Sequence, residues 1–91
     1  MNYYLLVYYL GDDYLERRAP LREEHLRLVR EAHARGELVM AGALADPADK
    51  AVLVFRCTVK AVIEEFVRND PYVKNGIVER WEIRLWTVVV P

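Results

Sequence analysis

The sequence predicts an α+β domain in which strands and helices follow in the order β-α-β-β-α-β. Four segments are rich in branched and aromatic residues, as strands are, and two segments repeat apolar residues every three to four positions, as helices facing a core do. No repeat, linker or low-complexity stretch interrupts the 91 residues, so we expect a single domain over residues 1–91.

The first half of the chain is predicted to hold one strand and one helix. Asn2–Leu10 (NYYLLVYYL) is dense in aromatic and branched residues, which favours a strand. The segment GDDYLERRAP is predicted to turn the chain, because Pro20 is tolerated only in the first turn of a helix. A helix follows to about Arg35, where Gly36 is well placed to cap its C-terminus.

The second half is predicted to hold a hairpin, a second helix and a last strand. The strands ELVMAGALA and AVLVFRC are joined by DPADK, which is typical of a turn. Thr58 is suited to cap the second helix, which ends before Pro71 because proline disfavours helical geometry at Asp70. The apolar stripe of this helix consists of Val59, Val62, Ile63, Phe66 and Val67. The last strand is IVERWEIRLWTVVV, which we expect to end or bend near Trp86.

This order of elements indicates the ferredoxin-like arrangement, a four-stranded antiparallel sheet with both helices on one face. The other face should then be polar, yet both alternating sets of residues are apolar or aromatic in the first and third strands. In the first strand the two sets are Tyr3, Leu5, Val7 and Tyr9, and Tyr4, Leu6, Tyr8 and Leu10. Only the last strand alternates, with Trp81, Ile83 and Leu85 opposite Arg80, Glu82 and Arg84.

The uncovered apolar face predicts a partner. We expect a second copy of the chain to cover it, sheet against sheet, as a homodimer; a solvated face rich in tyrosine is the alternative. Trp81 and Trp86 are expected in the core or in that interface.

Composition and charge exclude several classes of partner. A net charge of -1 leaves no basic surface for nucleic acid, and no apolar run approaches the roughly 20 residues of a membrane span. The N-terminal segment lacks the basic region and cleavage site of a signal peptide, so we expect a cytoplasmic protein. Arginine outnumbers lysine ten to three and amides are scarce, which suits a thermophilic or GC-rich source, although arginine replacing lysine is not a general thermophile signal.

The inventory of reactive residues is short. The chain has no serine, which excludes a Ser-His-Asp arrangement, and Cys57 is the only cysteine, which excludes a disulfide or a paired-cysteine metal site. His25 and His33 lie eight residues apart on one predicted helix, about 12 Å along its axis, too far to bind one ion. With no glycine-rich phosphate loop either, we expect no metal and no cofactor.

His25 is the residue that most needs an explanation, because it occupies a position where a core-facing helix usually has an aliphatic residue. The stripe around it consists of Leu21, His25, Leu28, Val29 and Ala32. His25 is either a core histidine satisfied by one hydrogen bond or the working group of a site. Asp70, in the loop that leaves the second helix, is a plausible anchor that would fix the tautomer of the ring and make it a better base.

The segments REEHLRLVREAHARGELVMAGAL and NDPYVKNGIVERWEIRLW resemble the YCII-related (YciI-like) family. The resemblance rests on an R-x-x-H-L pattern, a glycine-containing second strand and a D-P-[YF]-x-x-x-G segment, in that order along nearly the whole chain. It implies a dimeric α+β barrel and an active site that pairs His25 with Asp70. The family often has Gly-Pro where this chain has Gly42 and Ala43, a departure that affects the wall of the expected pocket and leaves the substrate class open.

Three further residues are candidates for substrate binding. Gly42 would leave room for a ligand because it has no side chain. Tyr72 either aims its hydroxyl into the cavity or packs the loop, and Arg22 either holds a substrate carboxylate or lies on a solvated helix face.

These residues lead to two functional hypotheses. The first is a small cofactor-independent enzyme, isomerase-like or lyase-like, in which His25 performs general acid/base chemistry on a small organic substrate and Asp70 orients it. The alternative is a non-catalytic dimeric module that binds a small ligand or acts as an accessory subunit. If the protein is an enzyme, a cavity must lie beside His25. If the His25–Asp70 pair is instead purely structural, the ring should be closely packed and inaccessible to water.

Overall fold

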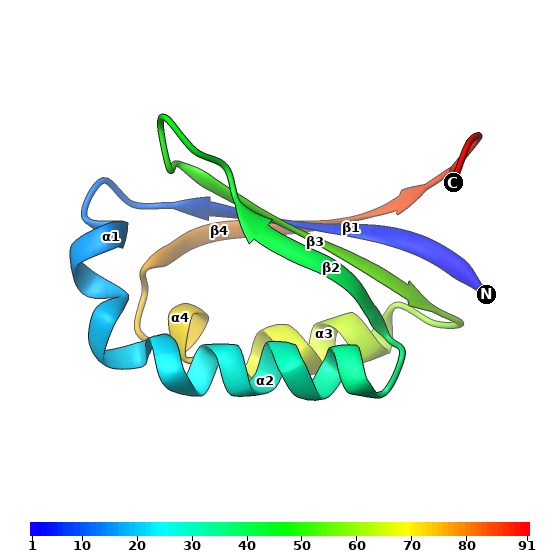
Figure 1. Cartoon of the computed structure of the whole chain (residues 1–91), viewed down its shortest axis with the longest axis horizontal. Helices are drawn as coiled ribbons and strands as arrows, with labels where there is room; N and C mark the ends of the chain where they lie inside the picture. Colours follow the sequence, from blue (N-terminus) through cyan, green and yellow to red (C-terminus); the bar gives the residue numbers. More distant parts are fainter.

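The structure is a computed structural model that describes residues 1–91. The elements in chain order are β1 (Asn2–Leu10), α1 (Tyr14–Arg17), the 3-10 turn η1 (Ala19–Leu21), α2 (Arg22–Ala34), β2 (Leu38–Ala43), β3 (Lys50–Cys57), α3 (Ala61–Asn69), α4 (Pro71–Lys74) and β4 (Val78–Trp86). The strands form one antiparallel sheet in the order β2-β3-β1-β4. Both long helices, α2 and α3, lie beneath one face of this sheet (Figure 1). The predicted ferredoxin-like α+β fold is therefore confirmed.

The core lies between the sheet and the two helices. β1 is an inner strand, and Leu6 at its centre pairs with Leu53 of β3 and Ile83 of β4, so that their side chains share the helix-facing side. On the helix side of the inner strands, Phe55 meets Phe66 of α3 edge to face, with ring centroids 5.4 Å apart. The largest fully buried side chains are Tyr8, Tyr72, Phe55, Leu6, Leu38, Ile63, Ile77 and Asp70. Asp70 is the one charged residue among them, which directs attention to its surroundings.

The segment between β1 and the first long helix differs from the prediction of a simple turn. It forms the short helix α1 and the turn η1, and α2 begins at Arg22. The physical reason is that Tyr14 is a buried anchor whose ring packs on Tyr72, which holds one helical turn against the core. Pro20 lies within η1, where its missing N–H costs nothing.

The start of the second helix also differs from the prediction. α3 begins at Ala61, its N-cap is Lys60, and no side chain caps it, so Thr58 does not have the predicted role. Backbone groups close the first turn instead, with the amide of Ile63 donating to the carbonyl of Lys60. Val59 precedes the helix and is 54% exposed, while the rest of the predicted stripe faces the core.

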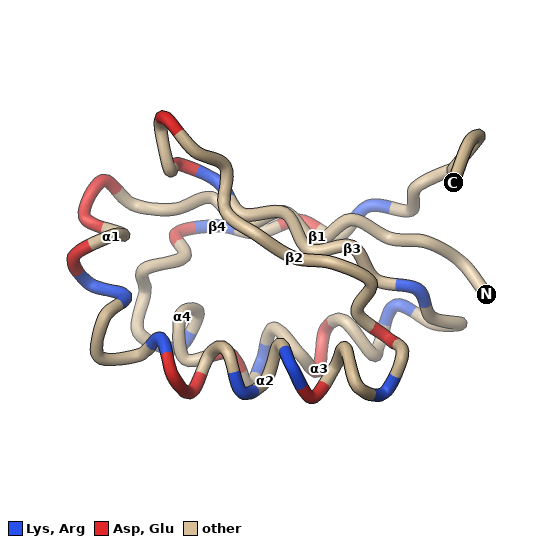
Figure 2. Tube along the Cα trace, in the orientation of Figure 1, with Lys and Arg blue, Asp and Glu red and all other residues tan.

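The sheet face opposite the helices carries no covering element (Figure 1). The two central residues of β1 on this face pair with apolar residues of β3 on one side and with charged residues of β4 on the other: Leu5 with Val54 and Arg84, and Val7 with Val52 and Glu82. Toward the ends of the strand, Tyr3 and Tyr9 pair with the charged residues Arg56 and Lys50 of β3. Figure 2 shows charged residues along the helices, whereas β1 carries none. The face thus has an apolar centre, bordered by the charges of β4 along one side and by Arg56 and Lys50 of β3 at its ends.

The edge strand β4 leaves both tryptophans accessible. Trp81 is 45% exposed and Trp86 is 44% exposed, so neither belongs to the core of the single chain. Both lie on a strand with only one neighbour, where side chains lack a second strand to pack against. None of the helices combines the length and the apolar character that crossing a membrane requires.

Candidate active site

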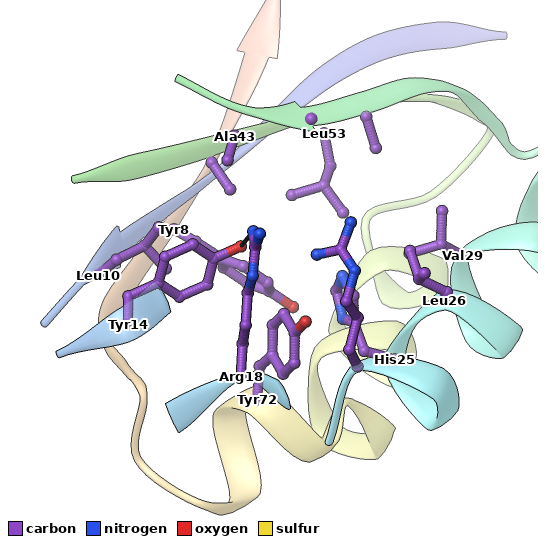
Figure 3. A pocket seen from close by; sticks show the side chains of 14 residues that line it. Tyr8, Leu10, Tyr14, Arg18, His25, Leu26, Val29, Ala43, Leu53 and Tyr72 are labelled. Atoms are coloured by element: carbon purple, nitrogen blue, oxygen red, sulfur yellow. Dashed lines mark hydrogen bonds between the residues drawn. The ribbon is translucent and has the colours of Figure 1, made fainter. Parts of the chain in front are cut away.

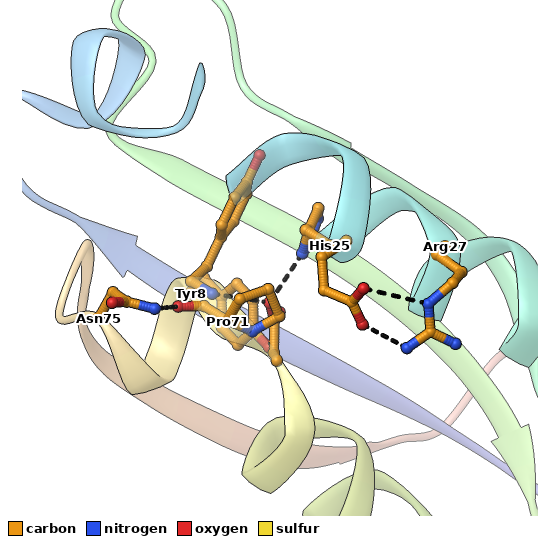
Figure 4. Close-up of polar contacts among 8 residues, drawn as sticks. Tyr8, His25, Arg27, Pro71 and Asn75 are labelled. Carbon is orange, nitrogen blue, oxygen red and sulfur yellow. Dashed lines mark hydrogen bonds and ion pairs between the residues drawn. The ribbon is translucent and has the colours of Figure 1, made fainter. Parts of the chain in front are cut away.

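The structure brings His25 and Asp70 into contact. The Nδ1 atom of His25, on the sheet-facing side of α2, lies 2.9 Å from Oδ1 of Asp70 (Figure 4). Asp70 is fully buried, and the side chain of His25 is 13% exposed. The backbone of Asp70 is extended, as expected of a residue that precedes a proline, and this bend between α3 and α4 turns the carboxylate toward α2.

Asp70 receives three hydrogen bonds, which compensate for burying a carboxylate. The backbone amide of Tyr72 donates to Oδ1 over 3.0 Å, because Asp70 is the N-cap of α4. The hydroxyl of Tyr8 donates to Oδ2 over 2.7 Å, and His25 supplies the third contact. Burial above all, and then the charge and hydrogen bond of Asp70, raises the pKa of Tyr8 far above its usual value, so the phenol stays protonated as a donor.

This arrangement fixes the tautomer of the neutral imidazole. A carboxylate only accepts hydrogen bonds, so the Nδ1 atom of His25 carries the proton that lies between the two residues. Nε2 is then unprotonated, and the chain provides no hydrogen-bond partner for it. His25 therefore presents a basic nitrogen whose orientation is set by a buried acceptor.

The ring of His25 is also held from one side by Tyr72. The two rings stack with centroids 3.8 Å apart and an angle of 8° between their planes. Tyr14 meets the edge of Tyr72, with centroids 6.0 Å apart. The hydroxyl of Tyr72 is buried and has no hydrogen-bond partner. Burial and then the charge of Tyr14 raise the pKa of Tyr72, while the charge and the nearby N–H donors of Arg22, and then the charge of Arg18, act against that rise. An arginine has no acceptor to offer, so the protonated hydroxyl of Tyr72 still lacks an acceptor for its own hydrogen.

A cavity of about 170 Å³ opens beside His25, between the sheet and the N-terminal half of α2 (Figure 3). Its sheet side consists of Tyr8, Leu10, Ala41, Gly42, Ala43, Ala51 and Leu53. Its helical side consists of Tyr14, Arg18, Arg22, His25, Leu26, Val29 and Tyr72. An apolar cavity with a few converging polar groups is the usual form of a small-molecule site.

Four of the predicted site residues line this cavity: His25, Tyr72, Arg22 and Gly42. Asp70 does not line it, and lies behind His25 as the buried hydrogen-bond acceptor. The structure thus places the predicted residues around one space. No group of three or more His, Cys, Asp or Glu residues is arranged to hold a metal ion.

Gly42 contributes its backbone to the cavity wall, but its missing side chain is not what opens the space. It pairs with Val52, which lies on the sheet face away from the helices, and a Cβ at this position would meet no atom within 4 Å. The neighbours Ala41 and Ala43 share the helix-facing side with Leu53, and their small side chains leave the room. Ala43, which stands where the family often has proline, is therefore part of the cavity wall.

Sequence reasoning missed three residues of the site. Tyr8 is on the helix-facing side of an inner strand, where a buried phenol needs a hydrogen-bond partner, and that requirement was a usable signal. Tyr14 and Arg18 reach the cavity through α1 and the residue after it. A helix of four residues is too short to show periodicity, so the sequence held no comparable signal for them.

Comparison with known proteins agrees with this description. Residues 1–87 match the sequence model of the YCII-related domain, and the chain belongs to this family. No protein of curated function matches the sequence closely enough to count as a relative.

Three solved structures share the fold. The 5-chloro-2-hydroxyhydroquinone dehydrochlorinase TftG from Burkholderia phenoliruptrix AC1100, solved with 2,5-dihydroxybenzoquinone, is similar with a TM-score of 0.78 over 93% of each chain, at 16% identity. A NIPSNAP family protein from Agrobacterium tumefaciens strain C58 is similar with a TM-score of 0.61, at 14% identity, over 96% of this chain and 91% of the other. An antibiotic biosynthesis monooxygenase is similar with a TM-score of 0.61, at 15% identity, over 99% of this chain and 100% of the other. At these identities the likeness establishes the α+β fold.

Proposed function

We propose that this protein is a small enzyme in which His25 acts as a general acid/base on a small organic molecule bound in the cavity. The observation that carries the proposal is that one edge of the ring is fixed by a fully buried carboxylate while the ring itself lines a cavity. A base oriented in this way needs no rearrangement before it removes a proton, which is the source of its catalytic advantage.

The reaction class follows from the groups that are present. One oriented base, a protonated phenol and two arginines suit the removal of a proton next to an electron-withdrawing group, followed by isomerisation or by loss of a leaving group. The similarity in fold to a dehydrochlorinase supports an elimination by analogy.

A non-catalytic module that binds a small ligand is the second candidate. The same cavity favours it, since a cavity beside His25 serves recognition as well as chemistry. A purely structural His-Asp lock is disfavoured, because a lock has no use for the open space next to the ring.

We also propose that the protein acts as a homodimer through the open face of the sheet. The apolar centre of that face, formed by β1 and β3, supports this, since a contiguous apolar surface of this kind is costly to leave in water. The charges of β4 at its border would then form a polar rim.

Base-promoted opening of 5-nitrobenzisoxazole tests the catalytic proposal, because this small planar probe reacts when a base removes one C–H proton. We expect the protein to open the probe faster than buffer does, with a rate that rises as His25 loses its proton. We expect His25→Gln to lower the rate about a hundredfold or more.

His33→Gln is the matched control. His33 lies on the same helix, is exposed, and contacts the backbone carbonyl of Leu38 instead of the cavity. This variant should keep the full rate. Equal rates for the unaltered protein and His25→Gln would contradict the catalytic proposal. A rise in melting temperature with a small ligand, without turnover, would then support the binding module.

A further inference from the structure

The positive charges around the cavity have no acidic partners within the chain. Arg18 and Arg22 both line the cavity, and neither forms an ion pair. By contrast, Arg17, which precedes Arg18, pairs with Asp13, and Arg27 on α2 contacts both Glu24 and Glu31. The guanidinium groups of Arg18 and Arg22 thus have N–H donors that no carboxylate of the chain occupies.

No negative charge opposes them at the cavity surface. The residues that line the cavity include no aspartate and no glutamate, and Asp70 is shielded behind the ring of His25. Arg18 is half-buried and Arg22 is exposed, so solvent screens part of their charge, yet two guanidinium groups without a counter-charge beside a mostly apolar space still favour an anion.

Hydroxyl groups add to the same preference. Arg18 stands beside Tyr14 in the cavity, and its Nη1 atom is 3.4 Å from the hydroxyl of Tyr14 (Figure 3). The hydroxyl of Tyr72 is buried without a partner in a residue only 1% exposed. A buried donor without an acceptor is rare, and a ligand oxygen would satisfy it.

The size of the cavity limits the rest of the ligand. A volume of about 170 Å³ is close to that of an apolar protein cavity of about 150 Å³ that holds one benzene ring. The remaining walls are aliphatic or aromatic, among them Leu26, Val29 and Leu53, and suit an apolar ring.

We propose that the cavity is specific for a small organic anion of about one ring, whose carboxylate or ionised enol or phenol oxygen is bound by Arg18, Arg22 and the hydroxyl of Tyr72. This assignment deepens the proposed function and rests on it for the placement of the ring beside His25. It assigns to Arg18 a part in substrate selection, together with Arg22. An ionised oxygen held by two arginines would also stabilise negative charge that develops when a proton is removed from the same ring.

Binding of benzoate, 4-nitrophenolate and benzamide tests the assignment. Benzoate and benzamide match in shape and differ in charge, and 4-nitrophenolate places the charge on a phenol oxygen. Dissociation constants come from shifts of backbone amide signals in NMR titrations, which also locate the site. We expect at least one of the two anions to bind at the cavity tenfold or more tightly than benzamide.

Three variants separate the contributions of Arg18, Arg22 and Tyr72 to anion binding. Arg18→Gln and Arg22→Gln should each weaken anion binding about tenfold and leave benzamide unchanged, and both effects should shrink at high salt. Tyr72→Phe should weaken anion binding without lowering the melting temperature of the free protein. Arg17→Gln is the matched control, since Arg17 lies next to Arg18 but pairs with Asp13 outside the cavity.

The assignment is overturned if benzamide binds as tightly as both anions, if binding maps outside the cavity, or if the Arg18 and Arg22 variants bind like the control. This result is distinct from failure of the proposed function. Opening of 5-nitrobenzisoxazole that depends on His25, without anion preference, overturns the anion site alone. Anion binding at the cavity without such opening leaves the site in place and contradicts the catalysis.

Discussion

Two of the hollows in the molecule, both beside α2, differ in their surroundings, and the larger of the two has the less reactive ones. The groove between α2 and α3, about 590 Å³, is lined by both signs of charge, and its Arg35 and Glu37 pair with each other over 2.9 Å. The cavity at His25, about 170 Å³, has unpaired arginines, an unpartnered phenol and an oriented imidazole. The difference is one of chemistry: the smaller cavity holds the polar groups without partners, and for that reason, not for its volume, we propose it as the ligand site.

The first way to sharpen this comparison is to damage the groove and leave the cavity intact. Phe55 is fully buried at the base of the groove and does not line the cavity. Phe55→Ala should reduce the free energy of unfolding by about 4 kcal/mol, because it removes a buried ring and leaves a void. Urea denaturation measures this loss. Benzoate affinity of the folded fraction should stay unchanged, and a large change in affinity would contradict the independence of the two hollows.

The second change removes the charge behind the cavity. Asp70→Asn replaces the acceptor of Tyr8, His25 and the amide of Tyr72 by a neutral group that accepts through only one oxygen. We expect a loss of about 3 kcal/mol in unfolding free energy, because hydrogen bonds to a buried charge are the strong ones. The rate of probe opening should fall about a hundredfold. A variant that is destabilised but fully active would show that Asp70 is structural only.

The third change concerns Tyr8 and predicts a pH dependence. Tyr8→Phe removes one hydrogen bond to Asp70 and should cost about 2 kcal/mol near neutral pH. The pKa of Tyr8 is raised by folding, so above about pH 10 the folded chain holds a proton that the unfolded chain releases. Stability is therefore fully present below that pH and declines as the pH rises.

Urea denaturation between pH 9 and pH 11 measures this decline. The slope attributable to Tyr8 approaches about 1.4 kcal/mol per pH unit above pH 10, since one proton is involved. The decline should be less steep in Tyr8→Phe. Tyr72 also has a raised pKa and adds to the slope in both proteins, so the difference between them is the quantity to compare.

The smallest expected effect on stability is that of Tyr72→Phe. Its hydroxyl is buried without a partner, so removing it relieves a desolvation cost and should leave the unfolding free energy unchanged or raise it by up to about 1 kcal/mol. The stack on His25 does not involve the hydroxyl and is retained. Thermal denaturation without ligand checks this prediction. A clear loss of stability would mean that the hydroxyl has a partner in the free protein.

The order of the main elements could be predicted from the sequence because it depends on periodicity. Strands such as Asn2–Leu10 and the stripe around His25 repeat apolar residues over several turns or pleats. The start of α3 could not be predicted from Thr58, because backbone hydrogen bonds close its first turn and no side chain is needed. Capping residues show where a helix is able to begin, not where it does.

The candidate site was predictable to the extent that its residues are individually unusual. A histidine on an apolar stripe and an aspartate before a proline each stand out in the sequence. Arg18 does not, because it is one of ten arginines and only the position of α1 turns it toward the cavity. Tertiary placement, which a linear pattern does not encode, separates it from its neighbour Arg17.

One oxygen atom of Asp70 has a consequence for spectroscopy. Oδ1 accepts from the amide of Tyr72, which starts α4, and also from the imidazole of His25. When the ring gains a second proton, its positive charge draws electron density from this shared oxygen, and the amide of Tyr72 must respond. The backbone signal of Tyr72 is therefore a built-in indicator of the charge on His25, readable in the intact protein without a substrate or a mutation.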